Sequence, residues 1–219
     1  MTPILNGIDE CALVDIDDVI KEAHGQKMQG SGYGYSGVCG LEAPLGIVSS
    51  QAAAPVIIGS RFRRGATGSR HGAKRFVSNI LPTVKRLRSD TATGLVLLRA
   101  DSAFYGRAVV SAAHHAKAKV SITARMGLAV KRATTFINED RWTTICHTNA
   151  ILDETTGKWN SVAEVADVTF TASSSRKKAE CIEGRLVVRR IQVLNRKKPP
   201  GNPPCPVPTG STSSSACPP

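Results

Sequence analysis

The chain has 219 residues, of which 41% are hydrophobic and 5% aromatic, so it can build a globular core and is not mostly disordered. Its 29 lysines and arginines outnumber its 17 acidic residues, which gives a formal net charge of +12 and a pI near 9.8. Such an excess favours polyanionic partners, either nucleic acid or an anionic membrane surface. No apolar run has the length of a transmembrane helix, and the acidic N-terminal stretch lacks the pattern of a signal peptide, so we expect a cytoplasmic protein with no membrane partner.

Three short strands are predicted in the N-terminal part of the chain. Residues 12–20 alternate apolar and acidic side chains, and the short apolar runs 44–50 and 55–62 are bounded by turn residues. The glycine-rich segment 29–40 predicts a turn, because its GxGxxG pattern lacks the preceding strand and following helix that a dinucleotide site requires. The short connections favour an antiparallel meander of three strands.

Helices and strands alternate in the next part of the chain. Apolar positions at helical spacing predict a helix over 69–87, with Ser69 as its N-cap and a break or kink at Pro82. The continuous apolar run 94–101 predicts a strand that is buried on both faces. Patterns further along predict, in order, a helix over 105–117, a strand over 119–126 and a short helix over 128–137. The order β-β-β-α-β-α-β predicts an α/β fold in which helices cover a mixed sheet.

The composition changes twice more towards the C-terminus. Residues 138–194 hold both tryptophans and several strand-like patterns, which indicates a β-rich segment. Residues 195–219 carry eight of the twelve prolines and few large apolar residues, so this tail is predicted to be disordered. We therefore divide the chain into a core over 1–137, a β-rich insertion over 138–194 and a tail over 195–219.

Two long stretches of the chain, 43–89 and 102–138, contain no acidic residue. A solvated helix face is the alternative explanation for one such run, but two runs in a basic chain favour contact with phosphates. Few aromatic residues are interleaved with the basic ones, so contact with a duplex backbone fits better than base stacking on a single strand. The candidate DNA-binding residues are Arg61, Arg63, Arg64, Arg70, Lys74 and Arg75.

Acidic residues are concentrated on two of the predicted strands. Asp15, Asp17 and Asp18 lie on the first strand, and Asp101 ends the fourth. Carboxylates within a phosphate-binding surface repel the ligand unless a cation lies between them, and metal-dependent phosphoryl transfer uses that arrangement. In a sheet of the ribonuclease H type the first and fourth strands are parallel neighbours, so Asp17 and Asp101 can share a metal. A helix cap is the alternative role for Asp101.

A family resemblance rests on four segments in this order: VDIDDVIKEAHGQKMQGSGYGYSGVCGLEAPLG, LLRADSAFYG, SITARM and SSSRKKAECIEGRLVVRRI. Together they make residues 12–194 similar to the DDE transposases of bacterial insertion sequences. The resemblance implies a ribonuclease H-like catalytic core that cuts and joins DNA strands with two Mg²⁺ or Mn²⁺ ions. It assigns the first catalytic and metal-binding carboxylate to Asp17, with Asp15 as the alternative, and the second to Asp101. It also implies double-stranded DNA partners (element ends and target), homo-oligomeric assembly and a nucleoid-associated location in a bacterial cytoplasm.

The chain departs from this family's pattern at several points. Val19 stands where the family has a threonine, and the third acid, a glutamate on a helix beyond the insertion, has no counterpart here. The family's N-terminal DNA-binding region is also missing, so we expect a core that is incomplete at both ends and a fragment with little or no activity alone. A non-catalytic basic DNA-binding protein is the alternative. A small metal-dependent nuclease would need a further acid, for which Glu22 and Glu139 are candidates.

Overall fold

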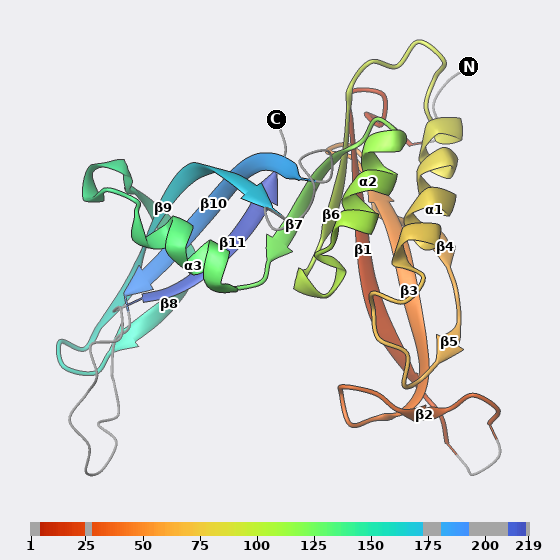
Figure 1. Ribbon diagram of the computed structural model, residues 1–219, viewed down its shortest axis with the longest axis horizontal. Coiled ribbons are helices and arrows are strands. Elements are labelled where there is room, and N and C mark those ends of the chain that lie inside the picture. The colour runs from red at the N-terminus through yellow and green to blue at the C-terminus, as the bar shows by residue number, and fades with distance from the viewer. Residues whose placement is uncertain (1–4, 25–27, 173–180, 193–209, 218–219) are drawn as a thin grey trace.

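The computed structural model describes residues 5–24, 28–172, 181–192 and 210–217, which form one continuous sheet with helices beside it (Figure 1). The strands are β1 (Cys11–Glu22), β2 (Gly32–Tyr33), β3 (Cys39–Ser49), β4 (Val56–Ser60), β5 (Arg63–Arg64), β6 (Leu95–Ala100), β7 (Lys119–Ala124), β8 (Thr143–Asp153), β9 (Lys158–Ala172), β10 (Ile182–Gln192) and β11 (Gly210–Cys217). The helices are α1 (Ala73–Leu87), α2 (Arg107–His115) and α3 (Leu128–Thr135), with short 3₁₀ turns η1 (Ser102–Phe104) and η2 (Glu139–Arg141).

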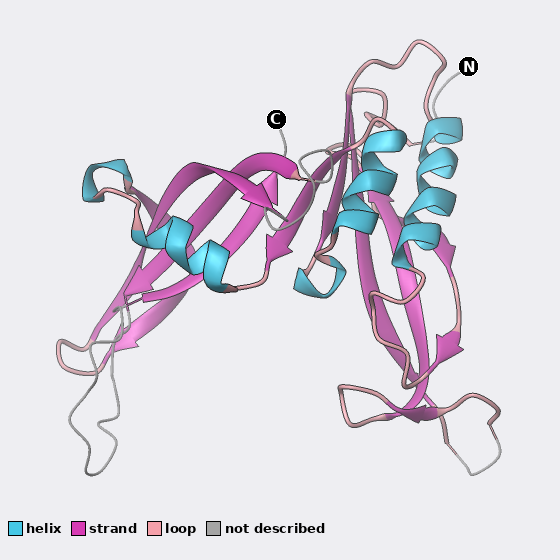
Figure 2. Ribbon diagram, viewed as in Figure 1, coloured by secondary structure: helices cyan, strands magenta, loops and turns pink. Residues whose placement is uncertain are grey.

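The predicted order of the main elements up to β7 is confirmed, and the fold is of the α/β class with a mixed sheet. The sheet runs β2-β3-β1-β6-β7-β11-β10-β9-β8, and β4 and β5 also pair with β3. Strand β3 is antiparallel to both β1 and β4, as a meander requires, whereas β1, β6 and β7 are parallel neighbours. Figure 2 shows α1 and α2 lying together on one side of this half of the sheet.

The main core lies between these two helices and the sheet. Helix α1 buries one stripe of side chains, among them Phe76, Ile80 and Val84, against the inward side chains of β1, β3 and β6. A Cβ atom added at Gly46 or Gly59 would lie only 3.0 or 2.9 Å from the Ile80 side chain, so these two glycines let the helix approach the sheet closely.

Helix α1 differs from its prediction at its start and at its proline. It begins at Ala73, after Gly72 in a left-handed conformation (φ 71°), and not after Ser69. It also continues through Pro82, because the buried Leu81 and Val84 hold the turns on either side of the proline against the core.

The other face of β1, β3 and β6 carries no helix among the described elements, and we call it the open face. Side chains alternate along a strand, so the residues opposite the buried Ala12, Val14 and Ile16 belong to this face. The prediction that β6 is buried on both faces is wrong, since Leu95 is 43% exposed and Leu98 is the one fully buried side chain of that strand. The open-face residues used below are Leu13, Asp15, Asp17, Val19, Lys21, Leu95, Leu97 and Arg99.

Strands β8, β9 and β10 make up most of the described part of residues 138–194, which was predicted to be β-rich. Strands β8, β9 and β10 are antiparallel, and α3 covers a second cluster that includes Val130, Phe170 and Leu186. Whether the predicted core and insertion fold as separate domains stays a prediction. No helix within the described ranges is long and apolar enough to cross a membrane.

The predicted disordered tail differs from the structure over Gly210–Cys217, which form β11 between β10 and β7. A strand needs only backbone hydrogen bonds from its neighbours, so a segment of small polar residues can pair without an apolar face. Residues 195–209 and 218–219 of the predicted tail lie outside the described residues.

Candidate functional site

The two predicted catalytic carboxylates follow the parallel pairing of β1 and β6. Ile16 pairs with Ala100 in the last pair between the two strands, so Asp17 and Asp101 each follow that pair directly, and neighbouring strands lie about 4.8 Å apart. The backbone of Asp101 is still extended (φ −78°, ψ −178°), although β6 has just ended. Side-chain alternation therefore places both carboxylates on the open face, and both residues are exposed.

Each of these carboxylates accepts one local backbone hydrogen bond. Asp101 Oδ1 accepts from the Ala103 amide at 2.9 Å and so caps η1, which is the simpler role that the sequence left open for this residue. Asp17 Oδ1 accepts from the Asp18 amide at 2.8 Å. Capping uses one oxygen of each group, which leaves the second oxygen of each to accept from solvent or a ligand.

Asp15, the alternative first ligand, is already paired. Arg99 donates from Nε at 2.7 Å and from Nη2 at 2.6 Å to its two carboxylate oxygens across β1 and β6. Both side chains are more than one third exposed, so the pair contributes little to stability, but it occupies both Asp15 oxygens. The guanidinium beside Asp15 therefore favours Asp17 over Asp15 as the carboxylate available to a ligand.

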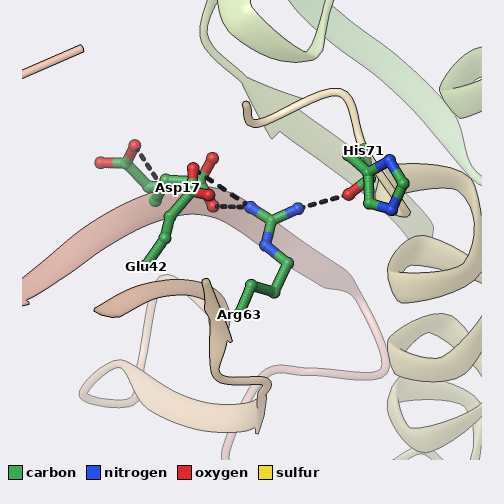
Figure 3. Close-up of polar contacts among 5 residues, drawn as sticks. Asp17, Glu42, Arg63 and His71 are labelled. Atoms are coloured by element: carbon green, nitrogen blue, oxygen red, sulfur yellow. Dashed lines mark hydrogen bonds and ion pairs between the residues drawn. The ribbon is translucent and has the colours of Figure 1, made fainter. Parts of the chain in front are cut away.

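Asp18 belongs to a buried ionic cluster, which we call the Arg63 cluster. Figure 3 shows Arg63 between Glu42 and His71 of this cluster. Arg63 Nη2 lies 2.8 Å from Asp18 Oδ1 and 3.3 Å from Glu42 Oε1, and Nη1 donates to the His71 carbonyl oxygen. The three ionic side chains are only 8–13% exposed. The cluster joins β1, β3 and β5 to the turn that precedes α1.

Two carboxylates share one guanidinium in this cluster, so one negative charge is left over. Burial, with the nearby Asp18 carboxylate as the second cause, raises the pKa of Glu42 to about 7, while Arg63 opposes the shift. The second oxygens of Asp18 and Glu42 are buried without a hydrogen-bond partner among the described residues. When Glu42 carries a proton, its carboxyl group can donate a hydrogen bond to the Asp18 carboxylate, whereas two ionised carboxylates can only accept. The sequence analysis did not identify Glu42 as part of any cluster.

The six predicted DNA-binding residues do not form one surface. Arg63 is buried in its cluster, whereas the other five side chains are exposed. Arg70 lies beside the Asp101 loop, because its Nη2 donates to the Tyr105 carbonyl at 3.2 Å. The sequence analysis did not select Arg125, whose Nε donates to the Ser102 carbonyl at 3.0 Å. Arg70, Arg125 and Arg99 thus bring positive charge to the loop that holds Asp101.

The donor set fits one divalent ion more readily than two. Within the described residues, no group of three or more His, Cys, Asp or Glu side chains is placed to hold a metal ion. Glu22 lies five residues along β1 from Asp17, about 16 Å away. Glu139 pairs with Arg190 of β10, which lowers the pKa of Glu139. Asp17 and Asp101 therefore offer two carboxylates, enough for a weak Mg²⁺ or Mn²⁺ site completed by other oxygens.

Comparison with protein-family models found no match to this chain, and comparison with curated proteins found none either.

Proposed function

We propose that the chain belongs to the class of proteins that carry out metal-dependent phosphoryl transfer on nucleic acid. The observation that carries the proposal is the parallel register of β1 and β6, whose last pair, Ile16 and Ala100, directly precedes the exposed Asp17 and Asp101. Arg70 and Arg125 hold the loop next to Asp101, in a chain with a net charge of +12. Carboxylates amid positive charge are suited to a cation that bridges to phosphate.

Within that class, we propose a fragment of a DDE transposase with a ribonuclease H-like core. Two observations support this reading: the ordered sequence motifs, and a strand order in which an antiparallel β4-β3-β1 meander continues into parallel β6 and β7. In such a protein a bound metal would supply Lewis-acid chemistry at a phosphate oxygen and at the water or hydroxyl that acts as the nucleophile. Asp17 and Asp101 would hold it, and the arginines would orient the DNA backbone.

The fragment is proposed to have little or no strand-transfer activity by itself. A second metal would need further ligands, and Asp15 is engaged by Arg99 whereas Asp18 and Glu42 are engaged by Arg63. The pair of ions that stabilises both the attacking and the leaving oxygen then cannot be held. The second candidate function, a non-catalytic basic DNA-binding protein, is favoured by the charge and by the cap that Asp101 forms on η1.

The test compares DNA binding and cleavage in the presence and absence of metal. Labelled duplex DNA is titrated with wild type, with Asp17→Asn and Asp101→Asn, and with Asp90→Asn as a control at an exposed loop carboxylate. We expect Mg²⁺ or Mn²⁺ to tighten binding by wild type and by the control but not by the two site variants. Equal metal dependence in all four proteins would overturn the site, and metal-independent binding would favour the alternative. Robust strand transfer by wild type would contradict the proposed inactivity.

A further inference from the structure

Two tyrosines stand at the far end of the β1–β3 ribbon with their rings in solvent. Tyr33 is 72% exposed and Tyr35 is fully exposed, although large aromatic side chains are usually buried. The segment that carries them is held closely against its neighbour: a Cβ atom at Gly34 would lie 2.5 Å from the Gly65 carbonyl oxygen, and the Gly65 amide donates to the Gly30 carbonyl. The turn is thus built to fix the backbone and to present the rings.

The pairing partners show that one ring shares a face with the candidate site. Asp17 pairs with Leu45 of β3, Lys21 and Arg64 both pair with Leu41, and Tyr33 pairs with Cys39. These β3 partners are all odd-numbered, so alternation puts the four side chains on the open face. Lys21 and Arg64 are exposed, and Val19 between Asp17 and Lys21 is 46% exposed.

Asp17, Lys21, Arg64 and Tyr33 lie in a row along the open face, which together with Tyr35 we call the track. Leu45 and Cys39 are six residues apart on β3, so the level of Tyr33 lies about 20 Å along the sheet from that of Asp17. A strand that rises about 3.4 Å per nucleotide, as in stacked B-form DNA, covers this distance in roughly six nucleotides, and a more extended strand covers it in fewer. The track offers carboxylates at one end, two cations near the middle and aromatic faces at the other end. On β1 and β3 the neighbouring acids, Asp18 and Glu42, point to the opposite face and are paired with Arg63.

We propose that this track binds one DNA strand with unpaired bases, which stack on Tyr33 and Tyr35 while Lys21 and Arg64 contact its phosphates. A duplex keeps its bases stacked on one another, so it cannot use exposed tyrosine faces, whereas a single strand can. The inference rests on the proposed function for the direction of the strand towards Asp17. It also revises the sequence-based view that aromatic residues are too sparse for stacking, because pairing along β3 brings tyrosines and cations together from separate segments.

The experiment separates stacking from charge by using two ligands. Fluorescence anisotropy in EDTA measures binding of a labelled oligothymidylate of about ten nucleotides, and of an abasic strand of equal length that keeps the phosphates. We expect wild type to prefer the strand with bases by about tenfold or more, and Tyr33→Ala/Tyr35→Ala to lose that preference. Tyr33→Phe/Tyr35→Phe should retain it. Trp159→Ala, which removes an aromatic ring that is 70% exposed on the distant β9, is the matched control and should behave as wild type.

The contribution of Lys21 and Arg64 is measured from the way in which the affinity for each strand depends on salt concentration. Lys21→Gln/Arg64→Gln should make the slope of log affinity against log salt shallower by about 1.4, or about 0.7 for each lost phosphate contact, for both ligands. Arg75→Gln, at an exposed cation on α1, removes one positive charge on the helix-covered side and should leave the slope for these short strands unchanged.

Three results would overturn the proposal that the track binds a single DNA strand. Equal affinity of wild type for the two strands, or an unchanged preference in the double alanine variant, overturns it. Loss of binding to anionic vesicles with unchanged DNA binding in that variant would assign the tyrosines to a membrane surface and would also overturn it. Repeating the titration in Asp17→Asn, still in EDTA, keeps the two proposals apart: the track predicts unchanged strand binding there, whatever the fate of metal-dependent cleavage.

Discussion

The pH dependence of stability should report directly on the Arg63 cluster. In the folded protein the pKa of Glu42 is raised to about 7 from the ordinary value of 4.5. Between these two pH values the folded chain holds a proton that the unfolded chain has released, so protonation stabilises the folded state. This contribution is fully present below about pH 4.5 and is lost as the pH rises through about 7.

The size of the effect follows from the shift. One pKa unit corresponds to about 1.4 kcal/mol, so Glu42 makes the free energy of unfolding fall by about 3 kcal/mol between pH 4.5 and pH 8. Glu42→Gln keeps nearly the same shape and a donor for Asp18 but carries no charge. We expect the variant to match wild type near pH 5 and to be more stable by up to about 3 kcal/mol at pH 8.

Urea unfolding followed by circular dichroism at intervals from about pH 5 to pH 8 measures this difference. The quantity to compare is the stability of the variant minus that of wild type at each pH, because this difference isolates the contribution of Glu42 from that of the rest of the chain. Glu22→Gln, at the exposed end of β1, is the control for the loss of a carboxylate outside the cluster. A Glu42→Gln difference that does not vary with pH, or a variant that is less stable at pH 8, would refute a shared proton in this cluster.

Three other substitutions probe the cluster, the site and the open face. Arg63→Met should lower the free energy of unfolding at pH 8 by about 3–5 kcal/mol, because it leaves two buried carboxylates without a cation; in the same urea assay Arg64→Met, at an exposed neighbour, should change it by less than about 0.5 kcal/mol. Arg99→Gln should lower the free energy of unfolding by less than about 1 kcal/mol. It should also tighten Mn²⁺ binding, measured by electron paramagnetic resonance, because it releases Asp15 beside Asp17. An unchanged affinity for Mn²⁺ would show that Asp15 cannot reach the ion. Ile57, which is 61% exposed on the edge strand β4, should promote self-association, so Ile57→Thr should shift sedimentation velocity profiles towards the monomer. Identical profiles would show that this part of the open face does not associate.

Much of the order of elements could be predicted because local patterns carry it. Alternation of apolar and acidic side chains marks β1, and the helical stripe of Phe76, Ile80 and Val84 marks α1, whose amphipathic face faces the sheet. A local sequence pattern does not show which helices or strands pack against the segment that carries it. The apolar run of β6 is suited to burial on both faces, but among the described elements helices lie over only one of them. Likewise the sequence of β11 has no apolar pattern that would predict a strand, and its pairing with β10 and β7 is seen only in the sheet register.

The candidate site, too, could be predicted from the sequence only in part. The adjacency of Asp17 and Asp101 follows from two Asp-bearing strands in a β-β-β-α-β order, so it was predictable from the sequence. The fate of Arg63 was not, because its contact with Asp18 spans 45 positions and depends on the two-residue strand β5. Sequence-based analysis could assign Arg63 only by its charge, and it therefore grouped a buried structural arginine with exposed ones.

The distribution of paired charges explains why Asp17 stands out among the acids of β1. Arg99 neutralises Asp15 on the open face, and Arg63 neutralises Asp18 on the covered face. Asp17, between them in the sequence, has only the Asp18 backbone amide as a partner among the described residues, and Asp101 has only the Ala103 amide. Two exposed carboxylates thus remain uncompensated within a strongly basic chain, and they repel a phosphate unless a cation is bound. For this reason the response of DNA affinity to metal, measured against Asp17→Asn, distinguishes a catalytic ancestry from simple charge attraction more sharply than affinity alone.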